Sequence, residues 1–208
     1  MAESGLGIGQ SVPRVEDRHL LEGRGTFVDN LAFPGIAHAA LVRSPHGHAD
    51  IVSIDTAAAR QAPGVLLVCS GEELAVEGLG GISSLLVPPE CDGRTTFLPP
   101  HPLLQTERVR FVGDRVAMVV AESLAQARDA AELIAVEYRA RPAVVRPGEA
   151  RAAGAPILWP QAPDNVCFRW SEGDREATEA AFAKADHIVE LDLINNRVIT
   201  NFIETRAA

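Results

Sequence analysis

A chain of 208 residues, 47% hydrophobic and 23% charged, is long enough to bury a core and too apolar to stay disordered. Its formal net charge of -9 disfavours binding to nucleic acid or anionic lipid, because a surface of that sign repels phosphate. Met1–Gln10 lack the basic and apolar regions of a secretory signal, and no apolar run approaches the roughly 20 residues of a membrane helix, so we expect a cytoplasmic protein without membrane insertion.

The three cysteines predict neither a disulfide framework nor a metal cluster. Cys69, Cys91 and Cys167 lie far apart in the sequence, are odd in number and include no Cys-x-x-Cys pair. We expect isolated reduced thiols, as is usual in a reducing cytoplasm.

The first part of the chain predicts an arm followed by a strand, helix, strand unit. Residues 1–19 are polar and charged, and a short strand-like stretch follows at Thr26–Asn30. The apolar run before Pro45 is expected to be a strand, because proline disfavours helix in the residue before it and donates no ladder hydrogen bond. The expected elements are strands at residues 36–43, 51–55 and 65–69, and a short helix at 55–61 that Asp55 or Thr56 caps.

A second strand, helix, strand unit is expected after an irregular region. Residues 71–105 carry many glycines and prolines and are expected to be mostly loop. After a turn at Gly113-Asp114, the stretch Val116–Ala121 is apolar enough to be a central strand. Ser123 is expected to cap the next helix, and residues 135–138 alternate as a strand with one solvated face. The expected buried face of this helix holds Leu124, Ala127, Ala131 and Ile134.

The last third predicts a linker and then the start of a further domain. Residues 141–173 carry repeated prolines and show no long helical period. Asp174 is expected to begin an alanine-rich helix that ends near Ala185, and residues 187–194 alternate as an antiparallel strand. Because so short a strand pair is marginal alone, we expect its partners either on another polypeptide or in a longer natural chain.

Short blocks along nearly the whole chain carry a resemblance to a known family. They occur in order and at compatible spacing, so the set is more specific than any single block. They are Ile8–Asp17, Leu21–Asn30, Arg43–Ala49, Ile54-Asp55, Pro63–Val65, Val112–Ala117, Ala127–Ala131, Val136–Tyr138, Ala185–His187, Asn196-Arg197 and Glu204–Ala208. The set resembles the opening of molybdenum hydroxylase large subunits, the family of xanthine dehydrogenase, aldehyde oxidase and carbon monoxide dehydrogenase, and most of all its bacterial carbon monoxide dehydrogenase-like branch.

This resemblance implies an α/β fold of the α+β kind, in which residues 20–140 form an α/β hammerhead domain behind an arm at 1–19. Residues 141–173 would be a linker, and residues 174–208 the truncated start of a molybdopterin-binding domain. The intact enzyme would hold molybdopterin, with none bound to this fragment. The implied partners are the remaining molybdopterin-binding domains or chain and iron–sulfur and FAD subunits or domains, and a homodimer is compatible with the resemblance.

The chain stops before the motifs with which the family holds and uses its cofactor. These are the glutamine loop at the molybdenum oxo group, the glycine-rich loop around the pterin and the glutamate base. We therefore expect no catalytic, cofactor-binding or metal-binding residue here, and a scaffold that is inactive alone within a molybdopterin-dependent oxidoreductase. Glu204 and Arg206 match a recurring pair of the family, and we expect them to be structural or to lie one layer behind the cofactor contacts.

Two other hypotheses stay open. The chain is alternatively a stand-alone interaction module, an adaptor for a separately encoded catalytic chain. A further alternative is a small metal-binding protein, because His46 and His48 form a His-x-His pair with Asp50 close behind. The two histidines also match a turn of the hammerhead, where imidazoles commonly bond to the backbone.

Overall fold

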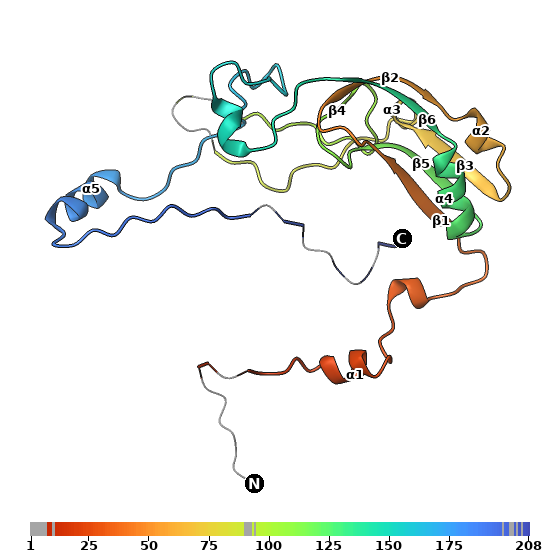
Figure 1. Ribbon diagram of the computed structural model, residues 1–208, viewed down its shortest axis with the longest axis horizontal. Helices are drawn as coiled ribbons and strands as arrows, with labels where there is room; N and C mark the ends of the chain where they lie inside the picture. Colours follow the sequence, from red (N-terminus) through yellow and green to blue (C-terminus); the bar gives the residue numbers. More distant parts are fainter. Residues whose placement is uncertain are drawn as a thin grey trace, which may run out of the picture. The chain divides into compact units, whose positions relative to one another are not determined.

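The computed structural model describes residues 8–9, 11–89, 93, 95–196, 198–199, 202, 204 and 206–208 (Figure 1). Its chain divides into two compact units, one formed by Gly35–Ile188 and one by Met1–Pro34 together with Val189–Ala208. Three features named above lie outside the described residues: most of the first ten residues of the predicted arm, Cys91 and Arg197. Cys69 and Cys167 are free thiols.

Six strands in the larger unit form two three-stranded sheets. The first sheet has the order β1-β5-β3 and the second has the order β4-β2-β6. Strand β5 is central in the first sheet, which confirms the central position predicted for Val116–Ala121. The strands are β1 His38–Arg43, β2 Ala49–Asp55, β3 Val65–Ser70, β4 Arg108–Val109, β5 Arg115–Ala121 and β6 Ala135–Ala140.

The helices are short, and a polar N-cap residue precedes each α-helix of the described residues. Ser123 and Asp174 accept backbone hydrogen bonds at the starts of α4 and α5, as predicted. No helix among the described residues is long and apolar enough to cross a membrane. The α-helices are α1 Asp17–Leu21, α2 Ala57–Arg60, α3 Gly71–Val76, α4 Leu124–Glu132 and α5 Arg175–Lys184, and the 3-10 helices are η1 Val28–Asn30 and η2 Pro147–Arg151.

Each predicted strand, helix, strand unit crosses from one sheet to the other. Helix α2 follows β2 of the second sheet and leads into β3 of the first sheet. Helix α4 follows β5 of the first sheet and leads into β6 of the second. All strand pairings among the described residues are antiparallel, so neither helix serves as the crossover of a parallel pair. The predicted α/β class is confirmed, and the pairing of the strands is what the structure adds.

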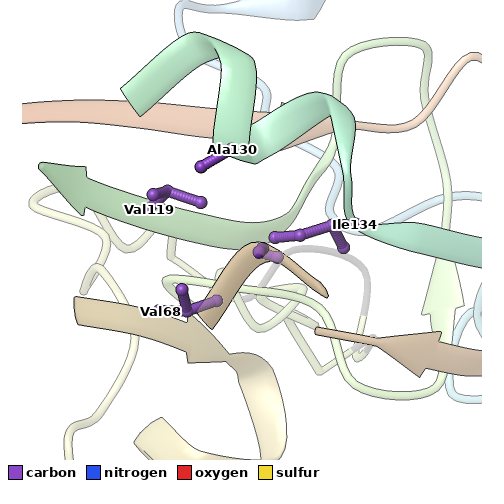
Figure 2. Close-up of a cluster of buried hydrophobic side chains, with 6 residues drawn as sticks. Val68, Val119, Ala130 and Ile134 are labelled. Atoms are coloured by element: carbon purple, nitrogen blue, oxygen red, sulfur yellow. The ribbon is translucent and has the colours of Figure 1, made fainter. Parts of the chain in front are cut away.

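Helix α4 packs across the first sheet through small side chains. Ala130 of α4 and Ile134, two residues after the helix, lie in one buried cluster with Val68 of β3 and Val119 of β5 (Figure 2). Ala127 is also fully buried, as predicted, whereas Leu124 remains 40% exposed in the first turn of the helix. The buried stripe therefore follows residues 127, 130 and 134, at the spacing of one helix face.

Three half-buried residues join the two sheets into one core. A second buried cluster, around Val109 and Val116, lies at the second sheet. Val42, Ile54 and Val136 pack against both this cluster and the one beneath α4. The two small sheets thereby pack against the same apolar side chains. A three-stranded sheet on its own would leave much of that apolar surface exposed to water.

Several local expectations were wrong. The strand-like stretch at Thr26–Asn30 is the 3-10 helix η1, and the predicted arm contains the short helix α1. Residues 187–194 form no strand. Val189, Leu191 and Leu193 are exposed by 73% or more, and no neighbouring strand of the described residues offers backbone hydrogen bonds to this segment.

The region expected to be mostly loop contains a helix at its start. Ser70 and Glu73 form a capping box, in which Ser70 Oγ accepts from Glu73 N at 3.4 Å and Glu73 Oε2 accepts from Ser70 N at 2.8 Å. This Ser-x-x-Glu spacing was the sequence signal for α3. The rest of the region is irregular, as predicted.

Replacing Ile134 with alanine tests the packing of α4. Ile134 is 7% exposed, so the variant should lose about 2 kcal/mol or more of unfolding free energy through the cavity it leaves. Urea unfolding followed by circular dichroism measures the change. Leu133→Ala is the matched control, since Leu133 is 49% exposed and should cost about 0.5 kcal/mol or less. Equal losses in the two variants would contradict this packing.

Candidate functional site

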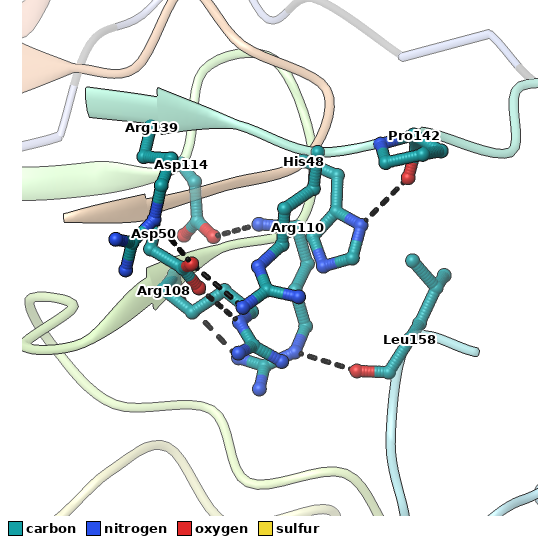
Figure 3. A network of polar contacts seen from close by, with 9 residues as sticks. His48, Asp50, Arg108, Arg110, Asp114, Arg139, Pro142 and Leu158 are labelled. Atoms are coloured by element: carbon teal, nitrogen blue, oxygen red, sulfur yellow. Dashed lines mark hydrogen bonds and ion pairs between the residues drawn. The ribbon is translucent and has the colours of Figure 1, made fainter. Parts of the chain in front are cut away.

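A carboxylate surrounded by arginines lies on the second sheet. Asp50 of β2 pairs in register with Arg108 of β4 and Arg139 of β6, so the three side chains share one face. Asp50 Oδ1 lies 2.8 Å from Arg108 Nε, and Oδ2 lies 3.3 Å from Arg139 Nε and 2.7 Å from Arg141 Nη2. Asp50 is itself buried, and Figure 3 shows Arg108 and Arg139 reaching it from two strands.

The arginines determine the charge of this site. The hydrogen bond from Arg141, followed by Arg108, holds the pKa of Asp50 well below its usual range, although burial acts in the opposite direction. The same contact raises the pKa of Arg141. Asp50 is therefore ionised throughout the neutral range and is unsuited to donate or accept a proton in catalysis.

A second buried carboxylate closes the turn before β5. Asp114 is 2% exposed and accepts hydrogen bonds from Gln105 Nε2 at 3.1 Å and from Arg110 N at 3.1 Å. The backbone N–H of Arg115 also donates to it, at 3.2 Å. These three bonds satisfy a charge that would otherwise be costly to bury. These three hydrogen bonds thus hold the Gly113-Asp114 turn that was expected from the sequence.

Arg110 attaches the segment after β6 to the second sheet. Its Nε donates to the carbonyl oxygen of Leu158 at 3.1 Å, and its guanidinium lies 3.4 Å from the centre of the Trp159 ring. At the start of the same segment, His48 Nδ1 lies 2.8 Å from the carbonyl oxygen of Pro142 (Figure 3). Because a carbonyl oxygen only accepts, Nδ1 carries the proton.

The segment after β6 is also held by hydrogen bonds within it and by a ring contact with Phe97. Asn165 has a positive φ of 56° and bridges three backbone groups, those of Leu158 at 3.0 Å, Ala150 at 2.9 Å and Pro156 at 2.9 Å. The ring of Phe97 packs edge-on against Trp159, at 5.8 Å between centroids. Residues 141–168, which make up most of the linker predicted at 141–173, are therefore held in a defined path along the larger unit. Only Asn165, a residue type that tolerates positive φ, hinted at this order in the sequence.

The structure does not gather the histidine and aspartate residues of the metal hypothesis. His46 packs edge-on against Tyr138, His48 faces Pro142, and Asp50 is occupied by arginines that a cation would have to displace. No three His, Cys, Asp or Glu residues in the described part of the chain are grouped so as to hold a metal ion. The arginine partners of Asp50 had no sequence signal, since Arg108 and Arg139 are distant in the chain.

Glu204 makes a long-range contact in the smaller unit. Its Oε1 accepts a hydrogen bond from the backbone N–H of Val28 at 3.1 Å. Arg206 is exposed. The contact of Glu204 joins the two segments of the chain that form this unit.

Comparison with known proteins shows which family this chain resembles. Residues 22–142 match the family described as "Aldehyde oxidase and xanthine dehydrogenase, a/b hammerhead domain". The nicotine 6-hydroxylase large subunit of Paenarthrobacter nicotinovorans is 38% identical over 96% of this chain and 23% of its own length. The carbon monoxide dehydrogenase large chain of Afipia carboxidovorans is 35% identical over 98% of this chain and 25% of its own length.

Solved structures show the same similarity. Reconstituted carbon monoxide dehydrogenase from Oligotropha carboxidovorans gives a TM-score of 0.66 at 35% identity, over 87% of this chain and 23% of that chain. The aldehyde oxidoreductase from Desulfovibrio gigas gives 0.62 at 31% identity, over 84% and 19%. The chain thus spans about a quarter of the length of the curated relatives it matches.

Replacing Asp50 with asparagine tests the arginine cluster through its pH dependence. The lowered pKa of Asp50 stabilises the fold above the unfolded pKa of about 4, and this contribution is lost as the pH falls below that value. Asp50→Asn should therefore melt well below the wild type at pH 7, with the gap narrowing towards pH 2. Melting temperatures across this range measure it, and a gap independent of pH would contradict the charge interaction. Asp129→Asn, on the exposed side of α4, is the control.

Replacing Trp159 with alanine tests the attachment of residues 141–168. Losing the stacking on Arg110 should cost about 1 kcal/mol and raise the rate of local opening about fivefold. Trypsin cleavage after Arg151, which is followed by Ala152, reports this opening. Trp170→Ala removes a Trp that is 66% exposed and should leave the cleavage rate unchanged. Equal cleavage rates in both variants would show that the stacking does not hold the segment.

Proposed function

This chain belongs to the aldehyde oxidase and xanthine dehydrogenase a/b hammerhead family, and on that premise we propose that it is the amino-terminal part, or a separately encoded piece, of a molybdenum hydroxylase large subunit. The proposal rests on how much of each chain is similar. Nearly all of this chain matches the relatives, but it matches only about the first quarter of their length. Its role is that of a scaffold, which is not catalytic alone.

The proposed division follows the family. Residues 20–140 form the hammerhead, and residues 174–208 begin a molybdopterin-binding domain completed by sequence that this chain does not contain. The complete enzyme is cytoplasmic, passes electrons to iron–sulfur and FAD subunits or domains, and a homodimer is one assembly compatible with it. Molybdopterin, when bound, supplies the oxidation of a small molecule or the hydroxylation of a carbon centre with oxygen from water.

The described hollows do not fit that cofactor. The groove between β3 and α3 is lined by Glu72, Glu73 and Glu77, whose negative charges repel a phosphate group. Arg60 also lines it, but its Nη2 forms an ion pair with Glu73 Oε1 at 2.5 Å. The hollow in the smaller unit is lined by Leu20, Gly23, Gly25, Phe27 and Asn30, none of them charged. We therefore assign no cofactor contact to these residues.

The chain's own residues serve to hold its elements in place. The guanidiniums of Arg108, Arg139 and Arg141 converge on Asp50, and Arg110 binds the path of residues 141–168. These contacts determine where the chain leaves the second sheet. We propose that they direct the following segment towards the cofactor domains, and that Glu204 ties the amino-terminal segment to the start of those domains.

Molybdenum content tests this function. The 208-residue chain, purified from cells that make molybdopterin, should hold far less than one molybdenum per chain. A chimera, in which this chain replaces the matching opening of the nicotine 6-hydroxylase large subunit, should retain the metal when produced with that enzyme's other subunits. Stoichiometric molybdenum in the chain alone would overturn the scaffold role. A folded chimera without molybdenum would overturn membership of such a large subunit.

A further inference from the structure

The first sheet has two apolar faces, and helix α4 covers one of them. Ala117 and Val119 of β5 point to α4 and are fully buried in its cluster. Side chains alternate along a strand, so Met118 and Val120 point to the opposite face. The buried cluster of this sheet lies on the α4 side, and the opposite face is here called the outer face.

The strand registers identify the residues of the outer face. In β1, Leu41 lies opposite Met118 and Ala39 lies opposite Val120. In β3, the corresponding partners are Cys69 and Leu67. Directly opposed residues of antiparallel strands share a face, so these side chains form two rows across all three strands. The outer face comprises Ala39, Leu41, Leu67, Cys69, Met118 and Val120.

Most of the outer face is accessible. Its six residues are uncharged, and Arg43, the next residue on this side of β1, is exposed at its edge. Leu41 is 37% exposed and Leu67 is 49% exposed, Ala39 is exposed, and Met118 and Val120 are half-buried. Only Cys69, at 8% exposure, is buried. A sheet in a stable domain normally buries both apolar faces, or carries polar residues on the one that meets water.

The outer face continues into the groove between β3 and α3. Leu67 and Cys69 line this groove together with Leu74 and Val76, and Val76 is 88% exposed. Glu72 and Glu77 also line the groove and are exposed. The surface is therefore an apolar area with an acidic border on the α3 side.

We infer that the outer face is a permanent interface, and that its occupant is the portion of the large subunit which, in the relatives, follows the stretch matched by this chain. A face with an apolar centre and charged residues only at its edges resembles a domain core cut in half, which is typical of obligate contacts. About three quarters of each relative lies beyond the matched stretch and is available to cover it. The inference rests on the proposed function.

A second copy of this chain fits the surface less well. A twofold pair would pack the outer face against itself. In the relatives the following portion belongs to the same chain, so it reaches this face at a higher effective concentration than a second copy does. The acidic border favours a partner surface with basic side chains at its edge.

A photo-crosslinker placed at Leu41 identifies the occupant. Benzoylphenylalanine replaces Leu41 in the chimera described above, and an otherwise identical chimera carries it at Glu132, an exposed position on α4. Cross-links from position 41 should map to the large-subunit portion after the chimera junction, and those from position 132 should be rare there. Cross-links to a second copy or to another subunit, or none in an assembled enzyme, would overturn the proposed occupant.

A charged substitution on the outer face shows whether this face is needed for docking or for folding. Leu41→Glu should leave the melting temperature of the 208-residue chain nearly unchanged, because the side chain is accessible, and should abolish molybdenum retention in the chimera. Leu124→Glu, at a similar 40% exposure on α4, is the matched control and should retain the metal. Equal molybdenum retention in both variants would overturn the interface. A chimera that holds no molybdenum before any substitution instead overturns the proposed function, and with it this inference.

Discussion

The ionised carboxylate of Asp50 is the constraint on which the second sheet depends. Its strand supplies one buried charge, while β4, β6 and the residue after β6 each supply an arginine. Strand β4 is only two residues long and has little ladder of its own, so this ion pair adds much to its attachment. An isolated buried charge would destabilise the fold, but one contacted by three guanidiniums fixes register and exit direction together.

Periodicity and capping made most elements of the larger unit predictable. Proline and glycine positions bounded β1 and β3, and Ser123 and Asp174 gave the starts of α4 and α5. The pairing was not predictable, because alternation along one strand says nothing about which other strand lies beside it. The expected strand at residues 187–194 failed for a related reason: a strand needs a neighbour, and its pattern alone supplies none.

The site was less accessible from sequence than the fold. The pattern around His46 and His48 drew attention to Asp50, but its arginine partners lie at positions 108, 139 and 141, where nothing in the local sequence marks them. Arg110 and Trp159 likewise meet only through the fold. The family resemblance, by contrast, was carried by blocks along the chain, and the comparisons confirmed the family.

The long-range pairing of the strands determines when the larger unit becomes stable during synthesis. Strand β1 can pair only after β5 has been made, and Asp55 of β2 pairs with Ala135, so each sheet joins residues about 80 positions apart in the chain. Contacts of such long range form late, after most of the chain is available. On the ribosome, the first sheet is incomplete until Ala121 has left the exit tunnel, and the second until Ala140 has left it. Shorter nascent chains display apolar strands to chaperones.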